Sequence, residues 1–463
     1  MSSNRRNFLK QLGSSAIVLG AGSFQDLAAR ERHERIVLQS QTRYSANDKL
    51  RIATIGMGIM GYNDTETAVK VPGVELVACC DLYSGRLQRA QEMYGKNIFI
   101  TKDYKEILDR KDIDAVIVAT SDNWHSTISI DALHKGKAVY SEKPIVHKFD
   151  QGWQVINAQR ETKKPMQIGS QRISSMVFAK ARELYKAGDI GKINSVEAVF
   201  NRQSALGAWE YTIPLDASSK TVDWERYQSL AAHKTAYDEK KFFWWRNYRD
   251  FGTGVAGDLF VHLLTGLHYI TESKGPSSIY SIGGLTYWKD GRDVPDVMTA
   301  VLEYPETKEH SAFQVVLRVN FVSGEGDTGY TRITGTEGVM EMGYDGFTIK
   351  KHKMAKAPGY GGWDALSTYP EAMQKQIIDA YNKKYSKADQ EIPKLPSVTY
   401  TAPKDEDEHL AHFANFFDAV RNGTPVIEPP DFAFRAAGPC LACNESYFQK
   451  KVIYWDAEKI KTV

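Results

Sequence analysis

The sequence is short of several features that would assign it to a specialised class. Its 463 residues include only four cysteines, too few for the dense disulfide framework of small secreted domains. Two of them, Cys440 and Cys443, form a lone CxxC without a second ligand pair, so buried thiols are expected and no metal site is predicted. Lys and Arg number 59 against 57 Asp and Glu, and this net charge of +2 makes nucleic acid an unexpected partner. A chain of this length that is 42% hydrophobic predicts two packed domains.

The N-terminus has the features of an export signal. A twin arginine within residues 4–10 (NRRNFLK) precedes a modest apolar stretch over residues 12–22. This pattern predicts a twin-arginine signal peptide over residues 1–30, a polar linker over 31–49 and a periplasmic location. The alternative is a retained membrane anchor, but the stretch contains glycines and serines and is shorter than the roughly 20 residues of a span. No later segment is long and apolar enough, so no membrane span is predicted for the mature chain.

A glycine-rich turn follows the first strand-like run. Residues 50–55 are apolar and β-rich, and they lead into the pattern GMGIMG and a helix-compatible stretch. In a dinucleotide-binding βαβ unit the first glycine allows a tight turn, the second admits the pyrophosphate, and the third lets helix and strand pack closely. Amides at the start of the helix face the negative charge. The residues predicted to contact the cofactor here are Gly56, Gly58, Ile59, Met60 and Gly61.

A carboxylate stands at the expected place after the second strand. Asp81 follows the run 74–80, about 20 residues after the last glycine, where an acidic side chain binds the adenosine ribose. Because a carboxylate repels a 2′-phosphate, Asp81 favours NAD over NADP, although Arg86 five positions later weakens that preference. The alternative is an aspartate that only shapes a turn at the strand end.

Further apolar runs complete a first domain. Runs at 115–120, 137–140 and 166–169 are short and continuous, as expected for parallel strands that are covered on both faces. They predict a doubly wound parallel sheet, so residues 50–170 are assigned to a Rossmann-type α/β domain.

Strand-like runs with helices between them recur in the remainder of the chain. Residues 171–463 are therefore predicted to form an α+β domain with a large open, mostly antiparallel sheet. Within it, residues 351–409 hold Gly/Pro-rich loops around one predicted helix. They are interpreted as an insertion that covers the substrate crevice or extends an interface.

Three short motifs occur together at the predicted strand ends. They are the run 141–144 (SEKP), the run 120–125 (TSDNWH) and the run 169–172 (GSQR), and a turn at 335–338 (GTEG) follows. With these motifs the chain, from about residue 50 to 332, resembles the glucose-fructose oxidoreductase/inositol dehydrogenase (Gfo/Idh/MocA) family. The resemblance implies cofactor contacts from Thr120, Asp122, His125, Glu142, Lys143 and Gln171.

The resemblance also implies three catalytic residues. In that family the lysine of the Glu-Lys-Pro motif, here Lys143, sits at the nicotinamide and touches the substrate hydroxyl. Asp258 and His262 are four residues apart on a predicted helix over 254–264 and so share one face. The family places such a pair over the nicotinamide with the histidine as acid and base, a role that suits a pKa near the working pH. The alternatives are a surface lysine and a structural histidine satisfied by a neighbouring carboxylate.

Aromatic and arginine side chains before this helix are candidates for binding a sugar. Residues 244–249 (WWRNYR) combine aromatic planes, which suit the apolar face of a sugar, with guanidinium groups, which suit its hydroxyls. Such a cluster is also typical of a protein core. The predicted substrate residues are Arg172, Trp245, Arg246 and Tyr248.

The resemblance favours an NAD-dependent oxidoreductase that acts on a secondary hydroxyl of a sugar, a sugar derivative or inositol. Because no NAD(H) pool is expected outside the cytoplasm, an exported enzyme is expected to hold its cofactor tightly and recycle it within the site. The alternative is an exported NAD-dependent glycoside hydrolase of the same family, a branch that lacks the lysine and the Asp-x-x-x-His pair kept here. A non-catalytic ligand-binding protein is a third hypothesis. The family's open sheet face implies a homo-oligomer, a dimer or a tetramer.

Overall fold

The computed structural model describes residues 49–463. The predicted export signal over residues 1–30 and residues 31–48 of the predicted linker lie outside this range. No helix within the described range is long and apolar enough to cross a membrane.

The first sheet has six parallel strands in the order β3-β2-β1-β4-β5-β6. The strand order reverses between β1 and β4, and ligands of doubly wound sheets bind at the carboxyl ends of such a pair. The predicted Rossmann sheet is confirmed, and the short third strand is an addition to it. The strands are β1 Leu50–Ile55, β2 Val74–Cys80, β3 Phe99–Thr101, β4 Ala115–Val118, β5 Ala138–Glu142 and β6 Met166–Gly169. The helices between them are α3 Ile59–Ala68, α4 Ser84–Tyr94, α5 Tyr104–Asp109, α6 Asp122–His134 and α7 Phe149–Thr162.

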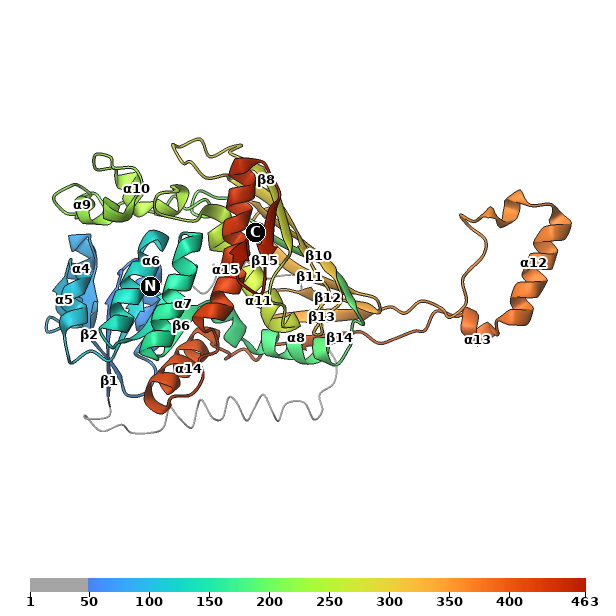
Figure 1. Cartoon of the computed structure of the whole chain (residues 1–463), viewed down its shortest axis with the longest axis horizontal. Coiled ribbons are helices and arrows are strands. Elements are labelled where there is room, and N and C mark those ends of the chain that lie inside the picture. The colour runs from blue at the N-terminus through green and yellow to red at the C-terminus, as the bar shows by residue number, and fades with distance from the viewer. Residues whose placement is uncertain (1–48) are drawn as a thin grey trace.

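The second sheet has ten strands and is mostly antiparallel, with one parallel pair between β7 and β10. This confirms the predicted α+β architecture of the second domain. Helices α8 (Met176–Lys186), α11 (Val261–Thr271) and α15 (Pro430–Gln449) lie beside it (Figure 1). The strands are β7 Ile193–Asn201, β8 Ser278–Gly284, β9 Val297–Tyr304, β10 Phe313–Asn320, β11 Thr328–Gly335, β12 Gly338–Met342, β13 Gly346–Lys351, β14 Val398–Thr401, β15 Ile453–Asp456 and β16 Lys461–Thr462.

One face of the second sheet is buried and the other is open. Along β10, Phe313, Val315 and Leu317 are buried in the core, whereas Gln314 and Val316 between them are exposed. Alternation of this kind is the pattern of a sheet that packs on one side only.

One late helix returns to the first domain. In α14 (Glu408–Asn422) the side chains of Phe413, Phe416 and Phe417 are fully buried and cluster with Tyr140 of β5. The rings of Phe413 and Tyr140 stack with their centroids 4.2 Å apart. A helix from within the predicted second domain therefore completes the core of the first. The domain limits predicted from the sequence, 50–170 and 171–463, assign this helix to the second domain.

The predicted insertion is a projecting arm. Strands β13 and β14 belong to the second sheet, so the projection runs only over residues 352–397 and carries α12 (Glu371–Lys384). It extends away from the body of the molecule (Figure 1), and no side chain between residues 358 and 397 is buried. Within one chain the arm therefore does not cover the substrate crevice, which was one of its two expected roles.

Removing an aromatic ring at the α14 contact is expected to destabilise the whole first domain. Phe413→Ala deletes a fully buried ring, so it should lower the free energy of unfolding by about 3–5 kcal/mol. Urea denaturation followed by circular dichroism measures the change. Leu215→Ala, at a fully exposed leucine, is the control and should stay within about 0.5 kcal/mol. A loss below 1 kcal/mol for Phe413→Ala would show that α14 is not part of that core.

Candidate active site

The glycine turn after β1 forms a cradle at a helix start. A Cβ on Gly61 would lie 1.8 Å from the carbonyl oxygen of Gly56, so strand and helix are too close for any other residue. A Cβ on Gly58 would have its nearest neighbours 4.0 Å away, on the Arg86 side chain, so this face of the turn is open to the pocket. No side chain caps the first turn of α3, which begins at Ile59. Gly56, Gly58, Ile59 and Met60 line the pocket, and this arrangement fits a pyrophosphate.

Asp81 is fixed by its own turn and still borders the pocket. Its two oxygens accept hydrogen bonds from the backbone amides of Met57 and Tyr83, each at 2.8 Å. The guanidinium of Arg86 lies 3.5 Å from Oδ2. A carboxylate and a guanidinium thus share the end of the pocket where the adenosine ribose is expected.

A segment between β7 and α11 covers this pocket, and we call residues 206–251 the strap. The amide of Asp223 donates to the carbonyl of Leu82 at 2.9 Å, and Trp124 Nε1 donates to the carbonyl of Tyr227 at 3.0 Å. Its helices α9 (Trp224–Tyr227) and α10 (Glu239–Phe243) lie over the first domain in Figure 1. The strap supplies two arginines, Arg226 and Arg246, and five aromatic side chains that line the pocket: Tyr211, Tyr227, Phe242, Phe243 and Trp245.

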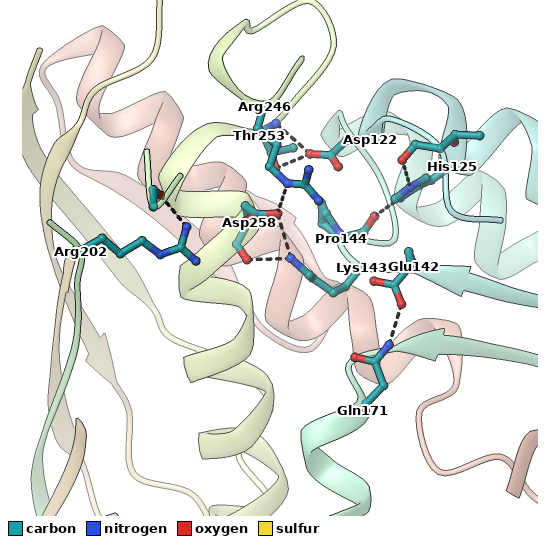
Figure 2. A network of polar contacts seen from close by, with 12 residues as sticks. Asp122, His125, Glu142, Lys143, Pro144, Gln171, Arg202, Arg246, Thr253 and Asp258 are labelled. Atoms are coloured by element: carbon teal, nitrogen blue, oxygen red, sulfur yellow. Dashed lines mark hydrogen bonds and ion pairs between the residues drawn. The ribbon is translucent and has the colours of Figure 1, made fainter. Parts of the chain in front are cut away.

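Most of the other predicted cofactor residues line the same pocket. Thr120, Asp122, His125, Glu142 and Lys143 do so. Asp122 Oδ2 also accepts hydrogen bonds from the amide and hydroxyl of Thr253, which ties α6 to the segment that precedes α11 (Figure 2). Gln171 is the exception, because it does not line this pocket but borders a second one. Its Nε2 donates to Glu142 Oε1 at 2.6 Å and to the hydroxyl of Tyr140 at 2.9 Å, so it positions Glu142.

Lys143 and Asp258 form the centre of the site. Lys143 Nζ donates to both Oδ1 and the carbonyl oxygen of Asp258 at 2.9 Å, and Arg246 Nε lies 3.1 Å from the same Oδ1 (Figure 2). Burial alone would raise the pKa of Asp258, but the charges of Lys143 and Arg246 hold it well below its usual range. The buried carboxylate is therefore ionised, and it fixes the ammonium of Lys143 at the point where Lys143 also borders a second pocket.

His262 borders the second pocket beside Asp258, as predicted, but its electrostatic environment is unexpected. Burial, followed by the charge of Lys143, lowers the pKa of His262 to about 3. The expectation of a pKa near the working pH is wrong for the cofactor-free protein. The predicted continuous helix is also interrupted, because Ala256–Phe260 form a π-helical turn before α11 begins. Such turns are frequent at functional sites.

A set of buried carboxyls lies beneath Lys143, and sequence inspection missed two of them, Asp64 and Glu428. Asp64 of α3 is fully buried, and burial together with the neighbouring charge of Glu142 raises its pKa well above the usual range. Burial also raises the pKa of Glu142 to about 7, against the lowering effect of Lys143. Glu428, after α14, accepts from the amide of Ser170, and burial raises its pKa to about 8. At least one of these acids therefore holds a proton at neutral pH.

The predicted substrate residues divide between the pockets. Arg172 lines the second pocket, where NH1 lies 3.3 Å from Glu408 Oε1. Arg246 borders both pockets, whereas Trp245 borders only the first. The prediction for Tyr248 is wrong, because its ring is buried in the aromatic cluster of the strap and lines neither pocket.

The fold and the paired pockets define a dinucleotide-binding α/β protein. Residues 50–170 match the model of an oxidoreductase family with an NAD-binding Rossmann fold, and residues 227–341 match the model of the GFO/IDH/MocA C-terminal domain. Together these matches cover just over half of the chain. The chain therefore belongs to the Gfo/Idh/MocA family of oxidoreductases.

Relatives within the family have different activities. An inositol 2-dehydrogenase from Salmonella paratyphi B is 31% identical over 145 residues, which are 31% of this chain and 43% of the relative. A glycosyl hydrolase family 109 protein from Shewanella baltica is 29% identical over 176 residues, which cover 35% of this chain and 38% of that protein. The chain spans less than half the length of these relatives. A solved levoglucosan dehydrogenase, in complex with NADH and levoglucosan, shares the fold at a TM-score of 0.61 and 17% identity, over 88% of this chain and 99% of its own.

Replacing Asp64 by asparagine is expected to flatten the pH dependence of stability. Because the pKa of Asp64 is raised, the folded state keeps a proton that the unfolded state releases above about pH 4. The contribution of Asp64 to the free energy of unfolding therefore falls as the pH rises above about 4, and a neutral asparagine removes this part of the fall. Urea unfolding at several pH values measures the slope.

The control for this experiment is Glu66→Gln, which changes an exposed acid on the same helix and should leave the slope unchanged. If the free energy of unfolding of Asp64→Asn depends on pH as it does in the native protein, Asp64 is ionised in the folded protein.

Proposed function

We propose that this protein is an NAD-dependent oxidoreductase that acts on a secondary hydroxyl of a sugar, a sugar derivative or inositol. The observation that carries the proposal is the position of Lys143, whose Nζ is fixed by Asp258 where the two pockets meet. The first pocket fits a dinucleotide, and the second is open to a molecule that reaches the same lysine. The inositol 2-dehydrogenase relative supports a polyol substrate.

Bound NAD supplies the chemistry of hydride acceptance. Lys143 donates a hydrogen bond to the reacting oxygen and stabilises the charge that develops on it. Asp258 keeps the ammonium in place, and Arg246 shares the charge of that carboxylate. His262 is neutral throughout the working range, as an acceptor of the hydroxyl proton must be, although a pKa lowered to about 3 makes it a weak base.

The cofactor proposed is NAD, not NADP. Asp81 is held at the ribose end of the pocket by two backbone amides, and its negative charge disfavours a 2′-phosphate there. Arg86 does not offer a free guanidinium, because it lies beside Asp81 and over the rings of Phe242 and Phe243.

We further propose that the protein is exported by the twin-arginine route to the periplasm with its cofactor bound and recycled in place. The twin arginine of residues 4–10 supports the route. The strap supports retention, because its aromatic side chains cover the pocket and its backbone is tied to the first domain at Leu82 and Trp124.

A second candidate function is NAD-dependent glycoside hydrolysis. The similarity to a glycosyl hydrolase family 109 protein supports it. The presence of Lys143, Asp258 and His262 favours the dehydrogenase, since the hydrolase branch of the family lacks this set. The two activities are distinguishable because hydrolysis releases an aglycone with no net change in the nicotinamide.

Protein purified without added nucleotide tests the proposal. Denaturation should release stoichiometric NAD, and addition of a sugar or inositol should raise the absorbance of the reduced nicotinamide. Lys143→Met should keep the bound NAD and lower the rate of reduction by about 10²- to 10⁴-fold, because it removes the donor to the reacting oxygen. Lys135→Met, at an exposed lysine of the first domain, is the control.

Three outcomes would contradict parts of this account. Nitrophenol release from aryl glycosides without net reduction would favour the hydrolase. An empty protein that turns over added NAD would remove the case for a retained cofactor. Normal turnover by both Lys143→Met and His262→Asn would refute the site, whereas binding of a sugar with no turnover by the native protein would favour a non-catalytic binding protein.

We also propose a homo-oligomer formed through the open face of the second sheet. Tyr280, Val301 and Val316 are paired across β8, β9 and β10, so they form an apolar row, and they are 43%, 43% and 36% exposed. The arm projects from β13 and β14 of the same sheet and carries Trp363 fully exposed. Apolar surface of this kind is covered in most assembled proteins.

A charge placed in this row should dissociate the oligomer. Val301→Glu puts a carboxylate at the centre of the row, and desolvating it in an interface is costly. Light scattering coupled to gel filtration is expected to show a dimer or tetramer for the native protein and a monomer for the variant. Val69→Glu, at a valine that is 37% exposed on the first domain, should not change the mass. A monomeric native protein would contradict the proposal.

A further inference from the structure

The second pocket contains an arginine whose charge no carboxylate balances. Arg202 follows β7 and lines the pocket together with Lys143 and His262. Its NH1 donates to the carbonyl oxygen of Gly207 at 2.7 Å, and the guanidinium lies 5.3 Å from the ring centroid of Phe321. Within residues 49–463 it forms no ion pair. Figure 2 shows Arg202 extending from the second sheet toward Asp258 and Lys143.

The other cations of the pocket each lie beside a carboxylate. Lys143 and Arg246 share Asp258, and Arg172 pairs with Glu408. The third carboxyl, Glu142, has its pKa raised to about 7, so it is only partly ionised at neutral pH. The pocket therefore has a positive excess that centres on Arg202. The charges of Lys143, Arg172 and Arg202 all act on His262, which shows that they surround the same space.

An arginine held in this way selects a particular kind of ligand. The backbone carbonyl of Gly207 and the ring of Phe321 restrict the guanidinium to one orientation, so little freedom is lost when a ligand binds. A planar guanidinium matches a carboxylate through two parallel hydrogen bonds, and neutral hydroxyls form weaker single bonds. The positive excess of the pocket also favours an anionic ligand over a neutral one.

We propose that the substrate is a sugar acid whose carboxylate binds Arg202 while its secondary hydroxyl faces Lys143. This inference rests on the proposed function for the identity of the reacting group, and it adds the substrate class and a specificity-determining residue. Arg172, held by Glu408 and by the carbonyl of Tyr344, borders the same pocket and adds positive charge without being free to reorient. A neutral sugar would leave Arg202 unbalanced.

Isothermal titration of the protein as purified, with matched pairs of ligands, tests the substrate class. Glucuronate and galacturonate should each bind at least about 10-fold more tightly than glucose and galactose. Arg202→Gln should weaken both acids by about 10- to 100-fold and leave the neutral sugars within about 2-fold. Arg202→Lys keeps the charge but loses the planar guanidinium, so its affinity for the acids should lie between those of the native protein and of Arg202→Gln. Arg318→Gln, at an exposed arginine of neighbouring β10, is the control and should change nothing.

The results that overturn the inference are specific. They are equal binding of acids and neutral sugars, equal weakening of both by Arg202→Gln, and no binding of either acid at millimolar concentration. Preference for glucose 6-phosphate over glucuronate would assign the site to a phosphoryl group and overturn the carboxylate. If acids bind through Arg202 but no acid, sugar or inositol reduces the bound nicotinamide, the proposed function is contradicted, and only the role of Arg202 in binding a carboxylate stands. Reduction of the bound nicotinamide by neutral sugars alone would support the proposed function and overturn this inference.

Discussion

The ion cluster of Lys143, Asp258 and Arg246 is the contact on which the rest of the site depends. A carboxylate buried at this depth is tolerated only if opposite charges and hydrogen bonds replace its lost hydration. Lys143 comes from the end of β5, Asp258 from the turn before α11, and Arg246 from the strap. Three separate parts of the chain must therefore fold together before the charge of Asp258 is compensated. The same requirement that joins the two domains also places an ammonium at the meeting point of the two pockets.

Charge is separated across this cluster. Below Lys143 lie Asp64 and Glu142, acids whose burial favours the protonated form. On the other side Arg172 and Arg202 keep the second pocket positive. A proton is therefore readily held beneath the lysine, whereas negative charge is stabilised above it. This polarity suits a reaction in which an oxygen becomes more negative as its hydrogen leaves as hydride.

The parts of this arrangement that could be predicted from sequence are local. The glycine turn, Asp81 and Lys143 each follow directly from a strand and its next few residues, and the order of these elements limits where they can lie. Asp64 and the docking of α14 became visible only in the structure, because they depend on contacts between residues more than 75 positions apart. Arg202 became visible only there because its place beside Lys143 and His262 depends on how the two domains meet. The pKa of His262 could not be inferred from its spacing to Asp258, since burial sets it. Tyr248 was wrongly predicted to contact the substrate because an aromatic run has the same composition in a protein core as in a sugar-binding site.

The strap gives the two pockets different access. Aromatic side chains between Tyr227 and Trp245 close the first pocket against the first domain, whereas the second pocket is walled by the sheet and by α11. A dinucleotide in the first pocket would lie under the strap, which is tied to the first domain at Leu82 and Trp124, whereas a sugar in the second pocket would lie between the sheet and α11. Under the proposed function, substrate and product exchange while the dinucleotide stays. A cofactor regenerated by a second substrate at the same lysine is the kinetic consequence of that geometry, and it requires no soluble nucleotide pool.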